Sequence, residues 1–140
     1  MFGNCVWAEL SSTHPINNNI LNFKRLFNLQ TFKSHITLEY DLKEPFIRDN
    51  YILDDLVIDG CPYLTCKDNF HAIQQDYFMK NNPLKKLHIS LAYKNGKEFT
   101  IKERDFINYM KMDNEISKKN IKVNLWNCNS RNPNLWKMIA

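Results

Sequence analysis

One six-residue pattern occurs twice in the chain, as His35-Ile36-Thr37-Leu38-Glu39-Tyr40 and again as His88-Ile89-Ser90-Leu91-Ala92-Tyr93. The His, Ile, Leu and Tyr positions are identical, and the third position carries a hydroxyl in both copies. Such agreement is improbable by chance within 140 residues. We therefore interpret the two stretches, called here the first and second motif, as products of an internal duplication.

Both motifs are rich in β-branched and aromatic residues, which predicts that each forms a strand. Because side chains alternate along a strand, each motif has one polar and one apolar face. The polar faces are His35, Thr37 and Glu39 in the first motif and His88, Ser90 and Ala92 in the second. The tyrosines share the apolar face with Ile and Leu, so Tyr40 and Tyr93 are expected in the core. If the two strands lie together, both imidazoles and both hydroxyls meet across one cleft.

The remaining segments alternate between strand-like and helix-like patterns. Strands are predicted at residues 5–10, 34–40, 51–58, 63–66, 70–78, 87–93, 121–126 and 135–139. Helical spacing of apolar residues predicts a helix over 15–29, and Thr100 with Glu103 has capping-box spacing before a helix that ends near residue 112. Turns are expected at Asp59-Gly60 and at Asn81-Asn82-Pro83.

The paired motifs resemble those of the 2H phosphoesterase superfamily. This group contains LigT-like RNA 2′,3′-cyclic phosphodiesterases, and viral and phage enzymes that degrade 2′,5′-linked or cyclic nucleotide signals. The resemblance implies one α+β domain over residues 1–140, bilobal and duplicated, with two antiparallel sheets that face each other across a cleft and helices outside. The chain departs from the family in two places: the two motif histidines are only 53 residues apart, and Asn81-Asn82-Pro83 stands where a helix is expected.

The resemblance implies that His35 and His88 are the catalytic acid and base, and that Thr37 and Ser90 bind the phosphate. An imidazole titrates near neutral pH, so one histidine can accept a proton while the other donates one, with no metal or cofactor. We expect cleavage of 2′,5′-oligoadenylate or a related cyclic oligonucleotide signal, in the manner of a viral enzyme that counters a host defence. The alternatives are RNA 2′,3′-cyclic phosphodiesterase activity and a module that binds nucleotides without cleaving them. A purely structural role for the two histidines also stays open.

Further substrate contacts are predicted with less support from the pattern. Aromatic rings stack on nucleic-acid bases with little sequence preference, and cationic side chains attract phosphate. The aromatic candidates are Trp7, Trp126, Trp136 and Tyr63, and the cationic candidates are Lys86 and Arg131. For each aromatic the competing interpretation is packing in the core, and for each cation it is simple solvation.

The composition limits the classes of partner. Lys and Arg number 19 against 15 Asp and Glu, a net charge of +4, and the surplus is mostly Lys. A mild surplus of Lys permits an oligonucleotide or cyclic nucleotide substrate and does not favour reading of duplex DNA. No apolar run approaches the roughly 20 residues of a membrane span. The first residues lack the pattern of a secretory signal, so we expect a cytoplasmic monomer that does not contact a membrane, with its four Cys as reduced thiols. No C-x-x-C pair is present, which argues against a zinc-ribbon or a thioredoxin-like site.

Overall fold

The computed structural model describes residues 2–45, 51–110 and 115–140. The strands are β1 (Asn4–Leu10), β2 (His35–Leu42), β3 (Leu56–Lys67), β4 (Phe70–Met79), β5 (Asn82–Asn95), β6 (Ile121–Asn127) and β7 (Lys137–Met138). The helices are α1 (Ile16–Phe27) and α2 (Ile101–Tyr109), and short 3-10 turns lie at Lys118–Asn120 and Pro133–Leu135. The predicted α+β class is confirmed.

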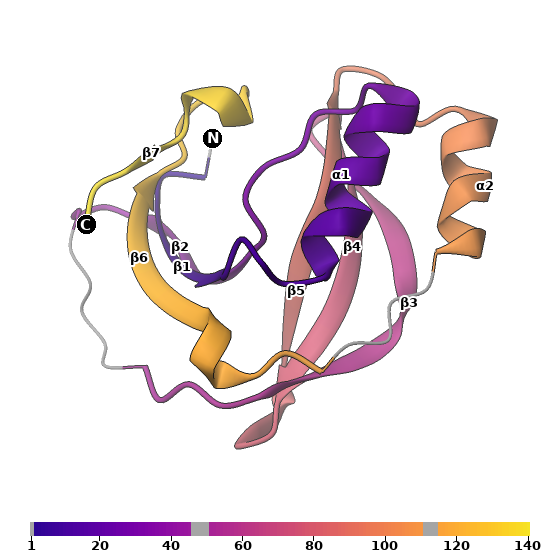
Figure 1. Ribbon diagram of the computed structural model, residues 1–140. Helices are drawn as coiled ribbons and strands as arrows, with labels where there is room; N and C mark the ends of the chain where they lie inside the picture. Colours follow the sequence, from indigo (N-terminus) through magenta and orange to yellow (C-terminus); the bar gives the residue numbers. More distant parts are fainter. Residues whose placement is uncertain (1, 46–50, 111–114) are drawn as a thin grey trace.

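The strands of the described residues form one hydrogen-bonded sheet in the order β3-β4-β5-β2-β1-β6-β7. All the strand pairs are antiparallel. The two motif strands, β2 and β5, are neighbours, and Ile36 pairs with Ile89. Two separate facing sheets were expected, and this topology does not confirm them. The strands β3-β4-β5 and β2-β1-β6-β7 instead belong to one sheet, and the motif strands β5 and β2 form the boundary between these two groups (Figure 1).

Each face of the sheet carries its own group of buried side chains. The larger core contains Ile16, Ile20 and Phe23 of α1 together with Ile36 and Ile89 of the motif strands. Figure 1 shows α1 and α2 in the half of the molecule that holds β3, β4 and β5. A second, mainly aromatic cluster consists of Cys5, Trp7, Phe70, Ala72, Tyr93, Trp126, Cys128 and Trp136. Helices therefore cover the apolar face of the motif strands, as the alternation predicts.

Each motif strand has a β-bulge at the fourth position of its motif, and this bulge places both tyrosines on a different face from the one predicted. In β2 the register moves from Trp7–Thr37 to Val6–Glu39, which leaves Leu38 as the extra residue. In β5 the register moves from Ile73–Ala92 to Gln74–Ser90, which leaves Leu91 as the extra residue. A bulge shifts the alternation by one residue, so the side chains beyond it change faces.

The side chains beyond the two bulges therefore lie on the faces opposite to those predicted. Tyr93 joins the aromatic cluster on the histidine face, and Ala92 belongs to the larger core. Tyr40 is 65% exposed, so its predicted place in the core is wrong. The simple alternation of the sequence could not show these exchanges, because the extra residue is defined only by the partner strand.

The middle of the chain forms longer strands than predicted. Residues 51–55 precede the strand, and β3 then continues through Gly60, where φ is 73° and the register shifts, so the predicted turn is a bulge. Met79 pairs with Asn82 across a tight turn, so β5 begins at Asn82 rather than at residue 87. The β4–β5 hairpin therefore occupies the place before the second motif where the family resemblance implies a helix.

The ends of α2 and of the chain follow the predictions closely. The Thr100 side chain accepts a hydrogen bond from the Glu103 backbone, and the Glu103 carboxylate accepts one from the Thr100 N–H. This capping box begins α2, which ends at Tyr109; the predicted extension over residues 111 and 112 falls outside the described residues. The expected pairing of the last strand with residues 121–126 is confirmed by Trp126 and Met138. Across the described ranges, no helix is long and apolar enough to cross a membrane.

Candidate active site

A cavity of about 510 Å³ lies over the motif strands on the aromatic side of the sheet. Its wall includes His35 and Thr37 of β2 and His88 and Ser90 of β5. The pairing of Ile36 with Ile89, continued by one residue each way, places His35 opposite Ser90 and Thr37 opposite His88. The structure thus brings together the four motif residues that were predicted to act on phosphate.

His35 is held deep in this wall by two contacts. Its imidazole stacks on the Trp7 indole, with ring centroids 3.5 Å apart and planes inclined by 15°. Its Nδ1 lies 2.6 Å from the backbone oxygen of Lys33. Because a carbonyl oxygen can only accept, Nδ1 carries the proton and Nε2 keeps its lone pair in the neutral ring. Burial, with a smaller contribution from the neighbouring His88, lowers the His35 pKa to about 4 against the opposing effect of the Lys33 hydrogen bond.

His88 occupies a more polar position than His35. It is partly exposed, and it pairs across the strands with Asp76 of β4. Burial lowers the His88 pKa, and the Asp76 carboxylate opposes that shift by favouring the charged imidazole. Asp76 also accepts a hydrogen bond from the Tyr63 hydroxyl. The two imidazoles therefore lie in different electrostatic environments, although they occupy equivalent positions in the repeated pattern.

The bulge in β5 adds a third hydroxyl to this group. Tyr93 lines the cavity and is 4% exposed, and its hydroxyl hydrogen-bonds with that of Ser90. Burial raises the pKa of Tyr93 above its ordinary value, so the phenol stays neutral. Tyr40, at the equivalent place in the first motif, lies on the exposed rim of the same cavity.

Aromatic side chains form the end of the cavity beyond His35 and Ser90. Trp136 lies edge-on to Trp7 and to Tyr93, at centroid distances of 5.7 and 5.8 Å. Its indole N–H donates to the Ser130 carbonyl, which fixes the ring. Phe70 packs near Tyr93 in the same cluster. This end offers apolar and aromatic surface next to the polar motif residues.

The remaining predicted contacts fall into two groups. Trp7, Trp136 and Lys86 line the cavity with the motif residues. Trp126 is buried beneath Trp7, where its N–H donates to Glu9, so its contact with substrate is not supported. Tyr63 lies outside the lining and contacts Asp76. Arg131 lies elsewhere, with its guanidinium bonded to the Asp68 carbonyl and the Asn95 side chain.

Sequence reasoning missed the part of the cavity that comes from β3 and β4. Thr65, Lys67 and Gln74 line it, as do Lys85 and the neighbouring thiols of Cys5 and Cys128. Gln74 pairs with Ser90, and Lys67 pairs with Phe70, so the antiparallel register carries these side chains to the same face. The two-residue turn at Asp68-Asn69 fixes that register, and it is the signal in the sequence that could have located them.

No group of three or more His, Cys, Asp or Glu side chains suited to a metal occurs among the residues that the structure describes. No protein-family model, curated protein or solved structure matched the chain.

Proposed function

We propose that this protein is a metal-independent phosphodiesterase that cleaves an oligonucleotide by acid–base catalysis between His35 and His88. The observation that carries the proposal is the convergence of both motif histidines and both motif hydroxyls in one cavity. Two imidazoles supply the proton acceptor and the proton donor that phosphodiester cleavage requires. A metal is not needed for either step.

The different environments of the two histidines support a proposal for their separate roles. His35 donates Nδ1–H to the Lys33 carbonyl and is kept neutral by burial, which leaves Nε2 ready to accept a proton. Burial lowers the His88 pKa as well, but Asp76 across the strands opposes that shift by favouring the protonated ring, and no such carboxylate among the described residues acts on His35. This difference supports His35 as the proposed general base and His88 as the proposed general acid.

The proposed reaction balances without a co-reactant when the substrate has a 2′,5′ linkage. His35 takes the proton of the free 3′-hydroxyl, the 3′-oxygen bonds to phosphorus, and the bond from phosphorus to the 5′-oxygen breaks. His88 gives its proton to that departing oxygen. The products are a 2′,3′-cyclic phosphate and a free 5′-hydroxyl. Thr37 and Ser90 donate hydrogen bonds to the non-bridging oxygens, where negative charge develops.

The proposed substrate class is 2′,5′-oligoadenylate or a related oligonucleotide signal, acted on in the cytoplasm. Lys67, Lys85 and Lys86 bring positive charge to the same cavity, and aromatic rings supply surface for a base. The bulges at equivalent leucines support the duplication: we propose that β3-β4-β5 and β2-β1-β6-β7 are its two lobes. The second candidate function, hydrolysis of an RNA 2′,3′-cyclic phosphate, uses the same histidines with water as the nucleophile.

The test is product analysis by mass spectrometry on a panel of 2′,5′- and 3′,5′-oligoadenylates, cyclic dinucleotides and 2′,3′-cyclic nucleotides. We expect cleavage of a 2′,5′ linkage that persists in excess EDTA and is lost in His35→Ala and in His88→Ala. The matched control is His71→Ala, because His71 is outside the cavity lining. Full turnover in either motif variant would overturn the assignment, and recovery of every nucleotide intact would favour a binding module.

A further inference from the structure

A second cavity of about 390 Å³ adjoins the first one at the end nearest His88. The two cavities share Leu38, Lys85 and Leu87 in their walls. Leu38 follows Thr37 in β2 and Leu87 precedes His88 in β5, and both leucines also pack on the larger core. The second cavity therefore reaches the first from the larger-core side of these two strands. Both volumes fall in the range of about 300–1,000 Å³ that is typical of small-molecule sites.

The order of side chains along β5 places the motif residues between two binding spaces. From the start of the strand, Asn82 and Lys85 line the second cavity, His88 and Ser90 occupy the centre, and Tyr93 belongs to the aromatic end. A one-nucleotide substrate whose phosphate meets the two histidines uses one of these spaces. A phosphodiester with a nucleoside on each side uses both.

The lining of the second cavity suits a nucleoside. Tyr51 supplies an aromatic ring; Leu53 and Met79 supply apolar surface; and the Asn81 and Asn82 side chains are amides. The Asn81 amide donates to the Ile52 carbonyl at 3.1 Å, which ties the segment that carries Tyr51 to the β4–β5 hairpin. An aromatic ring stacks on a base, and an asparagine amide matches the donor and acceptor of an adenine edge. The ammonium of Lys85, at the shared wall, suits a phosphate between the two spaces.

We propose that the second cavity is a subsite for the nucleoside on the leaving side of the scissile phosphate, so that the substrate is a linear dinucleotide or a longer chain. This inference rests on the proposed function. It agrees with the assignment of His88 as the acid, because the departing 5′-oxygen then lies at the end of the site where the second cavity opens. The nucleoside that carries the attacking hydroxyl lies at the aromatic end, beside His35.

The experiment compares two substrates that differ only in the leaving nucleoside. One is the 2′,5′-linked diadenosine monophosphate, and the other is adenosine 2′-(methyl phosphate), in which a methyl group replaces the second nucleoside. For Tyr51→Ala we expect kcat/KM to fall about tenfold on the dinucleotide, within the range reported for loss of base stacking, and to stay unchanged on the methyl ester. Asn82 is exposed at the rim of the second cavity, so Asn82→Trp fills the cavity without removing a buried side chain. We expect this variant also to lose activity on the dinucleotide and to keep it on the methyl ester.

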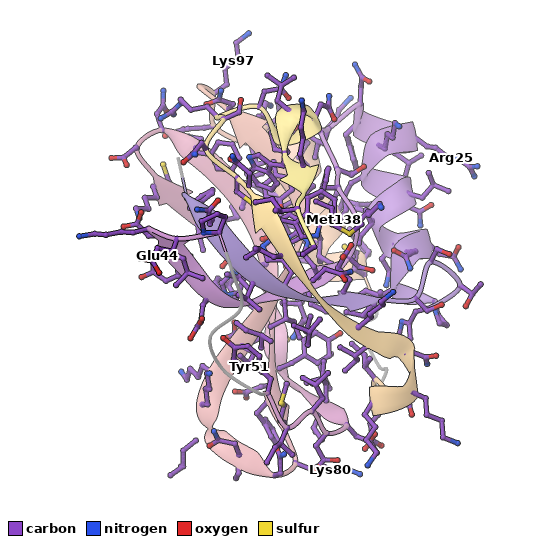
Figure 2. The ribbon with its side chains drawn as sticks, turned by 90° about the vertical axis from the view of Figure 1, so that its left-hand side faces the viewer. Arg25, Glu44, Tyr51, Lys80, Lys97 and Met138 are labelled. Carbon is purple, nitrogen blue, oxygen red and sulfur yellow. The ribbon has the colours of Figure 1, made fainter. Side chains whose placement is uncertain are left out.

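Matched controls use equivalent residues away from the cavity. Tyr109 is 81% exposed at the end of α2, and Tyr109→Ala should alter neither substrate. Lys97 is exposed and lies at the opposite end of the molecule from Tyr51 and Lys80 (Figure 2), so Lys97→Trp is the control for the bulky ring that Asn82→Trp introduces. Equal losses on both substrates, or full activity on the dinucleotide in both cavity variants, would overturn the subsite while the proposed function stands.

A different result identifies failure of the proposed function itself. If the wild-type protein cleaves neither substrate, the phosphodiesterase proposal is wrong, and the dissociation constant of the intact dinucleotide then decides the subsite. Weaker binding by Tyr51→Ala and Asn82→Trp than by the wild type would support the second cavity as a nucleoside site. Equal binding by all three proteins would overturn it.

Discussion

The imidazole of His35 lies almost flat against the indole of Trp7, with 3.5 Å between the ring centroids. Trp7 is 1% exposed and also stacks on Trp126, so the imidazole completes a buried aromatic layer. Phe32 closes the layer from the edge, at 6.2 Å from His35. This packing removes the imidazole from water, which is the main reason for its low pKa.

The first prediction concerns the stability of the protein at acid pH. The His35 pKa is about 4 in the folded protein, against 6.5 for an ordinary imidazole such as that of the unfolded chain. Between these two pH values the unfolded chain therefore binds more protons than the folded protein. The free energy of unfolding should therefore rise with pH across this window, by roughly 3 kcal/mol from His35 alone. Urea unfolding at several pH values measures this slope.

The variant His35→Gln isolates the contribution of this residue. His14 and His88 also have lowered pKa values, and both remain in the variant. Their contributions have the same sign, so we expect a shallower slope in His35→Gln than in the wild type. Identical slopes in the two proteins would show that burial does not depress the pKa of His35.

The second prediction tests the hydroxyl that the bulge in β5 brings into the site. Tyr93→Phe removes the partner of the Ser90 hydroxyl and should lower kcat/KM on a 2′,5′-dinucleotide by about two- to tenfold, the value of one hydrogen bond. Tyr109→Phe is the matched control and should retain full activity, because Tyr109 is 81% exposed at the end of α2 and lies outside the cavity lining. A similar loss in both variants would contradict a positioning role for Tyr93.

The third prediction concerns the reactivity of the four thiols. Cys61 and Cys66 are exposed, whereas Cys5 and Cys128 are 2% and 1% exposed. The hydrogen bond with Cys5 and burial together raise the pKa of Cys128. Iodoacetamide should therefore label two cysteines quickly in the native protein and all four in urea, as counted by mass spectrometry. Rapid native labelling of Cys128 would contradict the packing of this cluster.

The fourth prediction concerns the start of α2. Thr100→Ala removes the N-cap oxygen that accepts the Glu103 N–H, which typically costs about 1 kcal/mol of stability. Glu103→Gln should also destabilise the protein, because it weakens the ion pair with Lys94 at 2.8 Å. Chemical denaturation gives both values. Thr13→Ala, at an exposed position outside any helix, is the control and should leave the unfolding free energy nearly unchanged.

Local patterns predicted the elements whose determinants lie within a few residues. The spacing of Ile16, Ile20 and Phe23 predicted α1, and the capping box predicted the start of α2. The repeated motif placed His35, Thr37, His88 and Ser90 on one face of their strands, and all four line one cavity. The predicted turn at Asp59-Gly60 was wrong because pairing with β4 outweighs the local preference of glycine for turns.

The sequence by itself determined that His35 shares a strand face with Thr37 and that His88 shares one with Ser90, because the alternation of a strand depends only on neighbouring residues. Tertiary structure decided the facing of Tyr40 and Tyr93, since a bulge exists only relative to a partner strand. It also decided the unequal surroundings of the two histidines: Trp7 comes to His35 from β1, and Asp76 comes to His88 from β4. Two nearly identical motifs therefore differ in proton affinity through neighbours that are distant in sequence.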